Sequence, residues 1–150
     1  MSTKAKYYLL EVFCLLLSAL FIYTAVSKWA DFNRYVEQVR NQPFPHWSFP
    51  LAIYGLPPVE LLIGFMVLIN RTRLIGLWTY FIVMLFFTVY VVLILMHVFG
   101  RVPCSCSGFI NTLSWPQHLI FNGLVTMLAG ISILINRQKA TTGISTAIIT

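Results

Sequence analysis

Charged residues are scarce in this sequence. Only 9% of its 150 residues are charged, whereas 59% are hydrophobic, and the mean hydropathy is +0.82. A water-soluble domain has roughly a quarter of its residues charged, so the composition excludes a soluble globule with a fully solvated surface. In a bilayer, apolar side chains can face lipid instead. The sequence therefore predicts an integral membrane protein that is in contact with the lipid bilayer.

Clusters of basic residues are also lacking. Ten Lys and Arg stand against four Asp and Glu, which gives a net charge of +6, but the cations are scattered singly between apolar runs. Binding to nucleic acid requires basic side chains gathered on one face, so nucleic acid is not an expected partner. Anchoring of loops at a membrane surface explains the scattered cations better.

The even alternation of a membrane barrel is absent, and long apolar runs take its place. A helix needs about 20 apolar residues to cross the bilayer core, and the segments 7–26, 51–69, 74–99 and 115–135 approach or exceed that length. Lipid offers the backbone no hydrogen bonds, so these segments must be helices. The predicted fold is all-α, a single integral membrane four-helix bundle with short loops and a loosely ordered tail over 136–150.

The first loop has a helical pattern of its own over residues 31–41. Asp31 can act as the N-cap, and the residue before Pro43 is biased away from helix, which ends the pattern. Apolar residues recur at i, i+3, i+4 and i+7, namely Phe32, Tyr35, Val36 and Val39. This pattern predicts a short amphipathic helix at the membrane interface or over the mouth of the bundle.

The basic residues are unevenly divided between the two sides of the predicted bundle. The N-terminus, the second loop and the tail hold six Lys and Arg, and the first and third loops hold four. Loops rich in Lys and Arg tend to stay in the cytoplasm. The bias predicts that both termini are cytoplasmic and that the first and third loops lie outside.

Cysteine is rare, but two of the three cysteines are one residue apart. Cys104 and Cys106 lie in the third loop, whereas Cys14 lies among leucines and is expected to be a small apolar filler. A disulfide between Cys104 and Cys106 would close a small strained ring, and strained exposed disulfides are labile. The pair is interpreted as a thiol–disulfide exchange site, with a permanent staple or two unrelated thiols as alternatives. A zinc site with His97 and His118 matches no familiar spacing, so no metal is expected.

Glu60 is the second candidate for chemistry, because it lies in the middle of the second span. A carboxylate at that depth normally faces the bundle and has a partner. Lys28, His97, His118 and Asn122 lie toward the same half of the bundle, and they form a candidate polar cluster for binding a ligand or cofactor. Glu60 is interpreted as a proton relay or a ligand contact, or as a structural hydrogen bond between helices. Snorkelling of the other side chains to the interface is the alternative for the cluster.

Three stretches and one asparagine together resemble a known family. The stretches are Ser-Lys-Trp-Ala-Asp-Phe at 27–32, Pro-Pro-Val-Glu at 57–60 and Pro-Cys-Ser-Cys-Ser-Gly at 103–108, and Asn122 follows them. In order and spacing they resemble the methylamine-utilisation membrane proteins of the MauE family, within the wider DoxX-like group. The resemblance covers about residues 7–135.

The resemblance implies a redox-associated four-helix protein of the bacterial inner membrane, linked to maturation of methylamine dehydrogenase. It implies Glu60, Cys104 and Cys106 as site residues, with Lys28 and Asn122 beside them. The leading hypothesis is a component of a thiol–disulfide oxidoreductase that exchanges with a thioredoxin-like or periplasmic enzyme partner. No cofactor motif is evident. A quinone is considered only because the oxidation of a membrane dithiol would need one.

Two other functions remain open from the sequence. One is a non-enzymatic assembly or scaffold subunit, in which the cysteines would serve as a staple. The other is a small-molecule carrier that uses Glu60, although a single short bundle without visible inverted repeats argues against it.

Overall fold

The structure is a computed structural model that describes residues 3–99 and 114–149, with side chains described for 4–99 and 114–138. Its long helices are α1 (Thr3–Ala30), α3 (Leu56–Leu68), α4 (Arg73–Leu95) and α5 (Trp115–Ile149). A short helix, α2 (Phe32–Arg40), lies between α1 and α3. The described residues contain no strand, so the prediction of an all-α fold is confirmed.

Four stretches of the chain are long and apolar enough to cross a membrane. They are Lys4–Ala30, His46–Leu68, Arg73–Leu95 and Trp115–Gln138. Many of their large apolar side chains are exposed, for example Leu16, Leu62, Ile75 and Met127. In water such a surface would be unfavourable, whereas in a bilayer it faces lipid.

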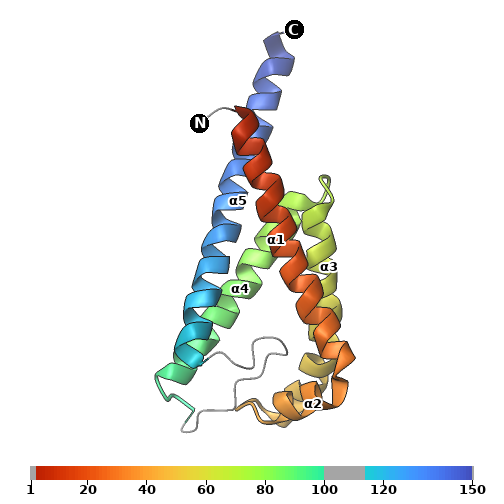
Figure 1. Cartoon of the computed structure of the whole chain (residues 1–150), viewed down its shortest axis with the longest axis vertical. Coiled ribbons are helices and arrows are strands. Elements are labelled where there is room, and N and C mark those ends of the chain that lie inside the picture. Colours follow the sequence, from red (N-terminus) through yellow and green to blue (C-terminus); the bar gives the residue numbers. More distant parts are fainter. Residues whose placement is uncertain (1–2, 100–113, 150) are drawn as a thin grey trace.

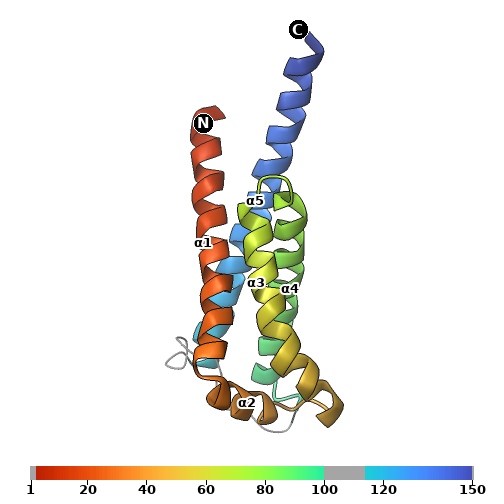
Figure 2. The same ribbon diagram turned by 90° about the vertical axis from the view of Figure 1, so that its right-hand side faces the viewer.

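The four long helices form a closed ring. Helix α1 packs against α3 and α5, and α4 packs against the same two helices. The start of α1 and the end of α5 lie at one end of the bundle, at the top of Figure 1. Helix α2 crosses the opposite end (Figures 1 and 2).

The core runs along the inside of this ring and is mostly aliphatic. Tyr80 is fully buried, and its ring stacks on that of Phe21 with the centroids 3.8 Å apart. Cys14 also belongs to this core, which agrees with its predicted role as an apolar filler. The other buried members are Leu10, Leu17, Ile63, Val67, Leu77, Met84, Ala129 and Ile133.

Helices α3 and α4 are held very close at the end where the termini lie. A Cβ atom on Gly76 would be only 2.8 Å from both the carbonyl carbon of Met66 and the amide nitrogen of Val67. Real Cβ atoms essentially never come that close to backbone. The absence of a side chain at Gly76 therefore allows the two helices to pack backbone to backbone.

A buried arginine strengthens the same corner. Arg73 is 3% exposed, and its guanidinium donates to both carboxylate oxygens of Glu11, at 2.6 and 2.9 Å. Arg73 Nε also donates to the carbonyl of Val67. This bidentate pair ties α1 to the α3–α4 turn.

The amphipathic loop helix is confirmed as α2. The Asp31 side chain accepts from the Arg34 amide and caps its N-terminus. Tyr35 and Val39 are buried, and Phe32 and Val36 pack against the same small cluster around Ile53. The predicted face therefore packs onto the bundle.

The start of α5 also follows its sequence pattern. The Gln117 side chain reaches back and accepts from the Ser114 amide at 2.8 Å. This is one of the two hydrogen bonds of a capping box.

Helix α4 ends at Leu95, earlier than the predicted limit at Phe99. The His97 and Val98 amides donate to the carbonyls of Ile94 and Leu93, and His97 has a φ of 54°. This pairing is the Schellman arrangement, which ends a helix through one left-handed residue. The apolar character of residues 96–99 gave no sign that the helix would end before them.

The second span begins at His46 rather than at the predicted Leu51, and it includes a wider turn. Leu51–Gly55 forms a π-helical turn that leads directly into α3. Pro57 and Pro58 have no amide hydrogen to give to the preceding turn. A wide turn before them adapts the helix to the missing donors.

The end of α5 also differs from the sequence-based expectation. The helix continues to Ile149, where a loose tail from residue 136 was expected. Lys6 on α1 donates to the Gln138 side chain at 3.2 Å, so α1 contacts α5 beyond the predicted end of the span. Residues 136–142 contain neither glycine nor proline to end a helix.

Candidate functional site

A buried ion pair joins α1 to α3 in the half of the bundle nearer α2. Lys28 Nζ lies 2.6 Å from Glu60 Oε1 and 2.5 Å from Oε2, so it contacts both oxygens. The side chains are only 13% and 3% exposed. The Thr24 hydroxyl adds a longer hydrogen bond of 3.4 Å to Oε2. Glu60 therefore faces the bundle and has a partner, as its depth in the span predicted.

Close packing of α1 on α3 places these groups side by side. The Ser18 hydroxyl donates to the Gly64 carbonyl at 2.8 Å. A Cβ atom on Gly64 would be 2.9 Å from Ile22 Cγ1, so glycine permits this approach. Gly64 is one helical turn after Glu60. The contact therefore brings the Glu60 carboxylate against α1.

Helix α2 covers this ion pair through Tyr35. The Tyr35 hydroxyl donates to the Ala52 carbonyl at 2.7 Å, and Lys28 Nζ lies 5.9 Å from the centre of its ring. That distance is within the range of a cation–π contact. Burial, reinforced by the nearby Glu60 carboxylate, raises the pKa of Tyr35 well above its usual value. The phenol therefore stays protonated and keeps its hydrogen bond.

A second polar contact connects the end of α2 to α4. The Tyr90 hydroxyl donates to Gln42 Oε1, and Gln42 Nε2 donates to the Gln38 carbonyl at 3.4 Å. Gln42 is 8% exposed, so this link is shielded from solvent. The segment after α2 is thus fixed across the bundle rather than only to its neighbour α3.

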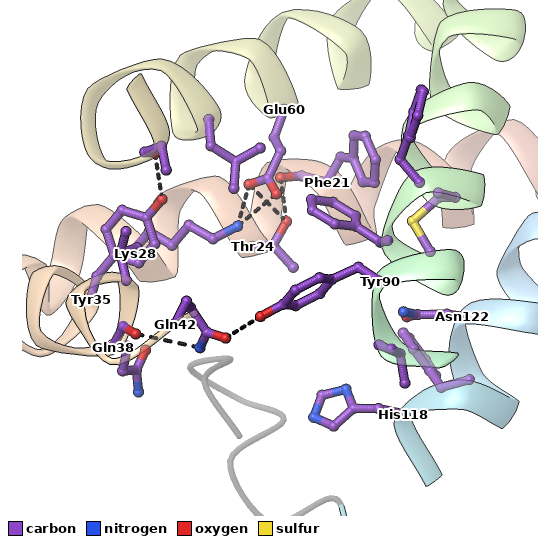
Figure 3. A pocket seen from close by; sticks show the side chains of 18 of the residues that line it. Phe21, Thr24, Lys28, Tyr35, Gln38, Gln42, Glu60, Tyr90, His118 and Asn122 are labelled. Atoms are coloured by element: carbon purple, nitrogen blue, oxygen red, sulfur yellow. Dashed lines mark hydrogen bonds and ion pairs between the residues drawn. The ribbon is translucent and has the colours of Figure 1, made fainter. Parts of the chain in front are cut away.

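These elements enclose a cavity of about 430 Å³, which lies within the described part of the chain. Figure 3 shows Lys28, Thr24 and Glu60 on one side, His118 and Asn122 on α5 across from them, and the Gln42–Tyr90 contact between. Most of the wall is apolar and includes Leu20, Phe21, Val39, Phe44, Leu56, Met84, Phe86, Phe87, Val91, Trp115 and Phe121. An apolar chamber with few converging polar groups is typical of small-molecule sites.

The structure gathers most of the predicted polar cluster. Lys28, Glu60, His118 and Asn122 all line the cavity. His97 does not line it, because it lies beyond the end of α4 in the left-handed turn and is exposed. His97 therefore lies apart from the other three residues of the predicted cluster, and the cause is the early end of α4.

The cysteine pair lies outside the described residues. Cys104 and Cys106 belong to the segment 100–113, which follows Phe99 and precedes Ser114. Within the described residues, no group of three or more His, Cys, Asp or Glu is placed to hold a metal ion. The described residues of the site offer a small molecule hydrogen-bonding groups and aromatic contacts.

Sequence reasoning missed several residues of the site. Thr24 had a usable signal, because it precedes Lys28 by four residues and so shares its helix face. Gln42 and Tyr90 had none, because they are far apart in the chain and meet only through the fold. Tyr35 was predicted as an apolar position, and its hydroxyl contact to Ala52 was not foreseen.

The fold and the site together define a small multi-pass membrane protein with a mostly apolar cavity, which a few polar groups also line, at one end of a four-helix bundle. A family model described as methylamine utilisation protein MauE matches residues 6–135. The chain therefore belongs to the MauE family, a family of methylamine-utilisation membrane proteins. No match was found among curated proteins or among solved structures.

Proposed function

We propose that this protein takes part in thiol–disulfide exchange on the outer face of the bacterial inner membrane. The observation that supports this role is the cavity at the end of the bundle where α4 ends and α5 begins. The segment that carries Cys104 and Cys106 is joined to the bundle by those two helices. The chain therefore joins a cysteine-bearing segment directly to the end of the bundle that holds a mostly apolar chamber with a few polar groups, which supports a role that combines an exchange group with a small reactant.

A single round of the proposed exchange needs no other reactant than a partner dithiol. A partner thiolate attacks one sulfur of the Cys104–Cys106 disulfide, whose S–S bond breaks as a mixed disulfide forms. The second partner thiolate then displaces the sulfur of this chain. The partner leaves with a disulfide, and its two protons end on Cys104 and Cys106. The family name supports a client that takes part in methylamine utilisation.

The proposed orientation rests on the distribution of basic residues. The start of α1, the α3–α4 turn and the end of α5 lie at the end opposite α2. By the positive-inside tendency this end, with six Lys and Arg against four, is the cytoplasmic one. We therefore place α2 and the cavity toward the oxidising side, where disulfides persist.

Trapping of a mixed disulfide tests the proposed exchange. The exchange is reversible, so in Cys106→Ser or Cys104→Ser the remaining thiol attacks the disulfide form of the partner. No neighbouring thiol is left to complete that reaction, and a covalent adduct with the partner should accumulate on non-reducing gels. Cys14→Ser is the matched control, because Cys14 is buried in the core and should form no adduct. If neither variant forms an adduct, and a stable complex survives loss of both Cys104 and Cys106, an assembly role replaces the exchange role.

A further inference from the structure

The charges that line the cavity cancel. Lys28 and Glu60 are paired, and the remaining polar groups of the wall are amides, hydroxyls, the Trp115 indole N–H and the His118 imidazole. A ligand with a net charge would meet no opposite charge that is not already paired, and it would lose its hydration on entry. The cavity therefore suits a neutral molecule.

Hydrogen-bond donors lie at two opposite sides of the chamber. An ammonium group has three donors, and Lys28 Nζ lies in the cavity wall with two contacts to Glu60. The Asn122 side-chain amide lies across the chamber, on α5 (Figure 3). A ligand with an acceptor at each end of a small rigid body would match this arrangement.

The walls between these donors are aromatic. Phe21, Phe87, Tyr90, Trp115 and Phe121 all line the cavity, so a flat ring can pack against ring faces or edges. A volume of about 430 Å³ lies within the usual range for small-molecule sites. The shape and chemistry of the wall favour a planar ring over a branched or strongly hydrated compound.

The cavity also reaches the lipid-facing surface. Phe86 lines it and is 72% exposed on the outside of α4. A long apolar substituent can therefore leave the chamber beside Phe86 and continue in the bilayer. Entry from lipid is the route expected for a ligand that is dissolved in the membrane.

We infer that the cavity is a binding site for the ring of a membrane quinone, with one carbonyl oxygen accepting from Lys28 and the opposite one from Asn122. The binding claim stands on the cavity, whereas its physiological role rests on the function proposed above. In that role, oxidation of the Cys104 and Cys106 thiols to a disulfide releases two electrons and two protons. The quinone takes up the two electrons and the two protons, and it leaves as the quinol.

A matched pair of substitutions on one helix tests the binding site. Leu56 lines the cavity, whereas Leu62 lies on the same helix and is 60% exposed to the lipid side. The purified full-length protein in lipid nanodiscs is titrated with a short-chain ubiquinone, and the bound quinone is extracted and measured by chromatography. We expect saturable binding of about one quinone per chain, weakened at least tenfold by Leu56→Trp and unchanged by Leu62→Trp.

Further variants keep the test independent of folding and of the cysteines. If Leu56→Trp fails to insert, Ala52→Leu reduces the same cavity by a smaller step. The double variant Lys28→Met, Glu60→Gln removes the ammonium donor without leaving a charge unpaired, and it should also weaken binding. The double variant Cys104→Ser, Cys106→Ser should bind quinone like the natural protein, so a failure of exchange and a failure of binding are separable.

Two outcomes would overturn the inference. The first is quinone binding that never saturates, or that stays unchanged in both Leu56→Trp and Ala52→Leu. Either result would mean that the quinone only partitions into the lipid. The other is equal displacement of the quinone by an alkane of similar length that has no carbonyl groups, which means that the chamber holds any apolar chain.

Discussion

Breaking the Lys28–Glu60 pair should destabilise the bundle strongly. The side chains are 13% and 3% exposed, and the ammonium contacts both carboxylate oxygens. Lys28→Met leaves the Glu60 carboxylate with only the long Thr24 hydrogen bond at 3.4 Å. Removing one partner of a buried pair costs about 3–5 kcal/mol, because a charge stays buried without compensation. We expect a loss in that range for Lys28→Met.

Replacing both partners should be much less harmful. In the double variant Lys28→Met, Glu60→Gln no charge remains buried, and such replacements are often close to neutral. We therefore expect it to lie within about 1–2 kcal/mol of the natural protein. The free energy of unfolding is measured by titration with a denaturing detergent for the natural protein, Lys28→Met, Glu60→Gln and the double variant. These four values together give the coupling between the two sites.

The second ion pair supplies the control for this cycle. Glu11→Gln acts on a side chain that is 29% exposed, and Arg73 keeps hydrogen bonds to the Val67 and Leu68 carbonyls. A smaller loss than for Lys28→Met is therefore expected. A loss below about 1 kcal/mol for Lys28→Met, or a double variant as unstable as the sum of its single changes, would show that the pair is not a buried, coupled unit.

Three further predictions concern packing, redox state and orientation. Gly76→Ala should destabilise the protein by more than about 1 kcal/mol, because the added Cβ would be 2.8 Å from the Met66 backbone. Thermal unfolding measures this loss, and an unchanged midpoint would refute the close contact. Cys104 and Cys106 should form a reversible disulfide with a potential above about −300 mV, measured by mass spectrometry after alkylation in dithiol buffers; two thiols in freshly isolated membranes would contradict it. After reduction, both cysteines should react with a membrane-impermeant thiol reagent in cells whose outer membrane alone is opened, and reaction only after the inner membrane is broken would reverse the proposed orientation.

Much of the fold was readable from the sequence because its signals are local. Scarcity of charge and four long apolar runs predicted the membrane helices, since the bilayer thickness fixes the length of a span. Asp31 and the apolar spacing after it predicted α2, because caps and helical periodicity act within a few residues. The depth of Glu60 predicted that it would face inward with a partner, because lipid penalises an isolated carboxylate.

Helix ends were less predictable, because competing backbone arrangements decide them. The Schellman turn at His97 ends α4 within an apolar stretch that periodicity could not divide. The wide turn over Leu51–Gly55 likewise depends on how the helix adapts to Pro57 and Pro58. Such features follow from individual hydrogen bonds rather than from hydropathy.

The sequence alone thus determined that this chain belongs in a membrane as a helical bundle, and that Glu60 and Lys28 are polar exceptions within it. Only the tertiary structure decided that these two residues contact each other, because Gly64 lets α3 approach α1 at that level. The tertiary structure also decided that His118 and Asn122 line the same cavity as Lys28 and Glu60, whereas His97 does not line it. It likewise decided that the Tyr90 hydroxyl reaches Gln42. The physical reason is range: burial and capping act along the chain, whereas a cavity exists only where separate helices fail to fill the space between them.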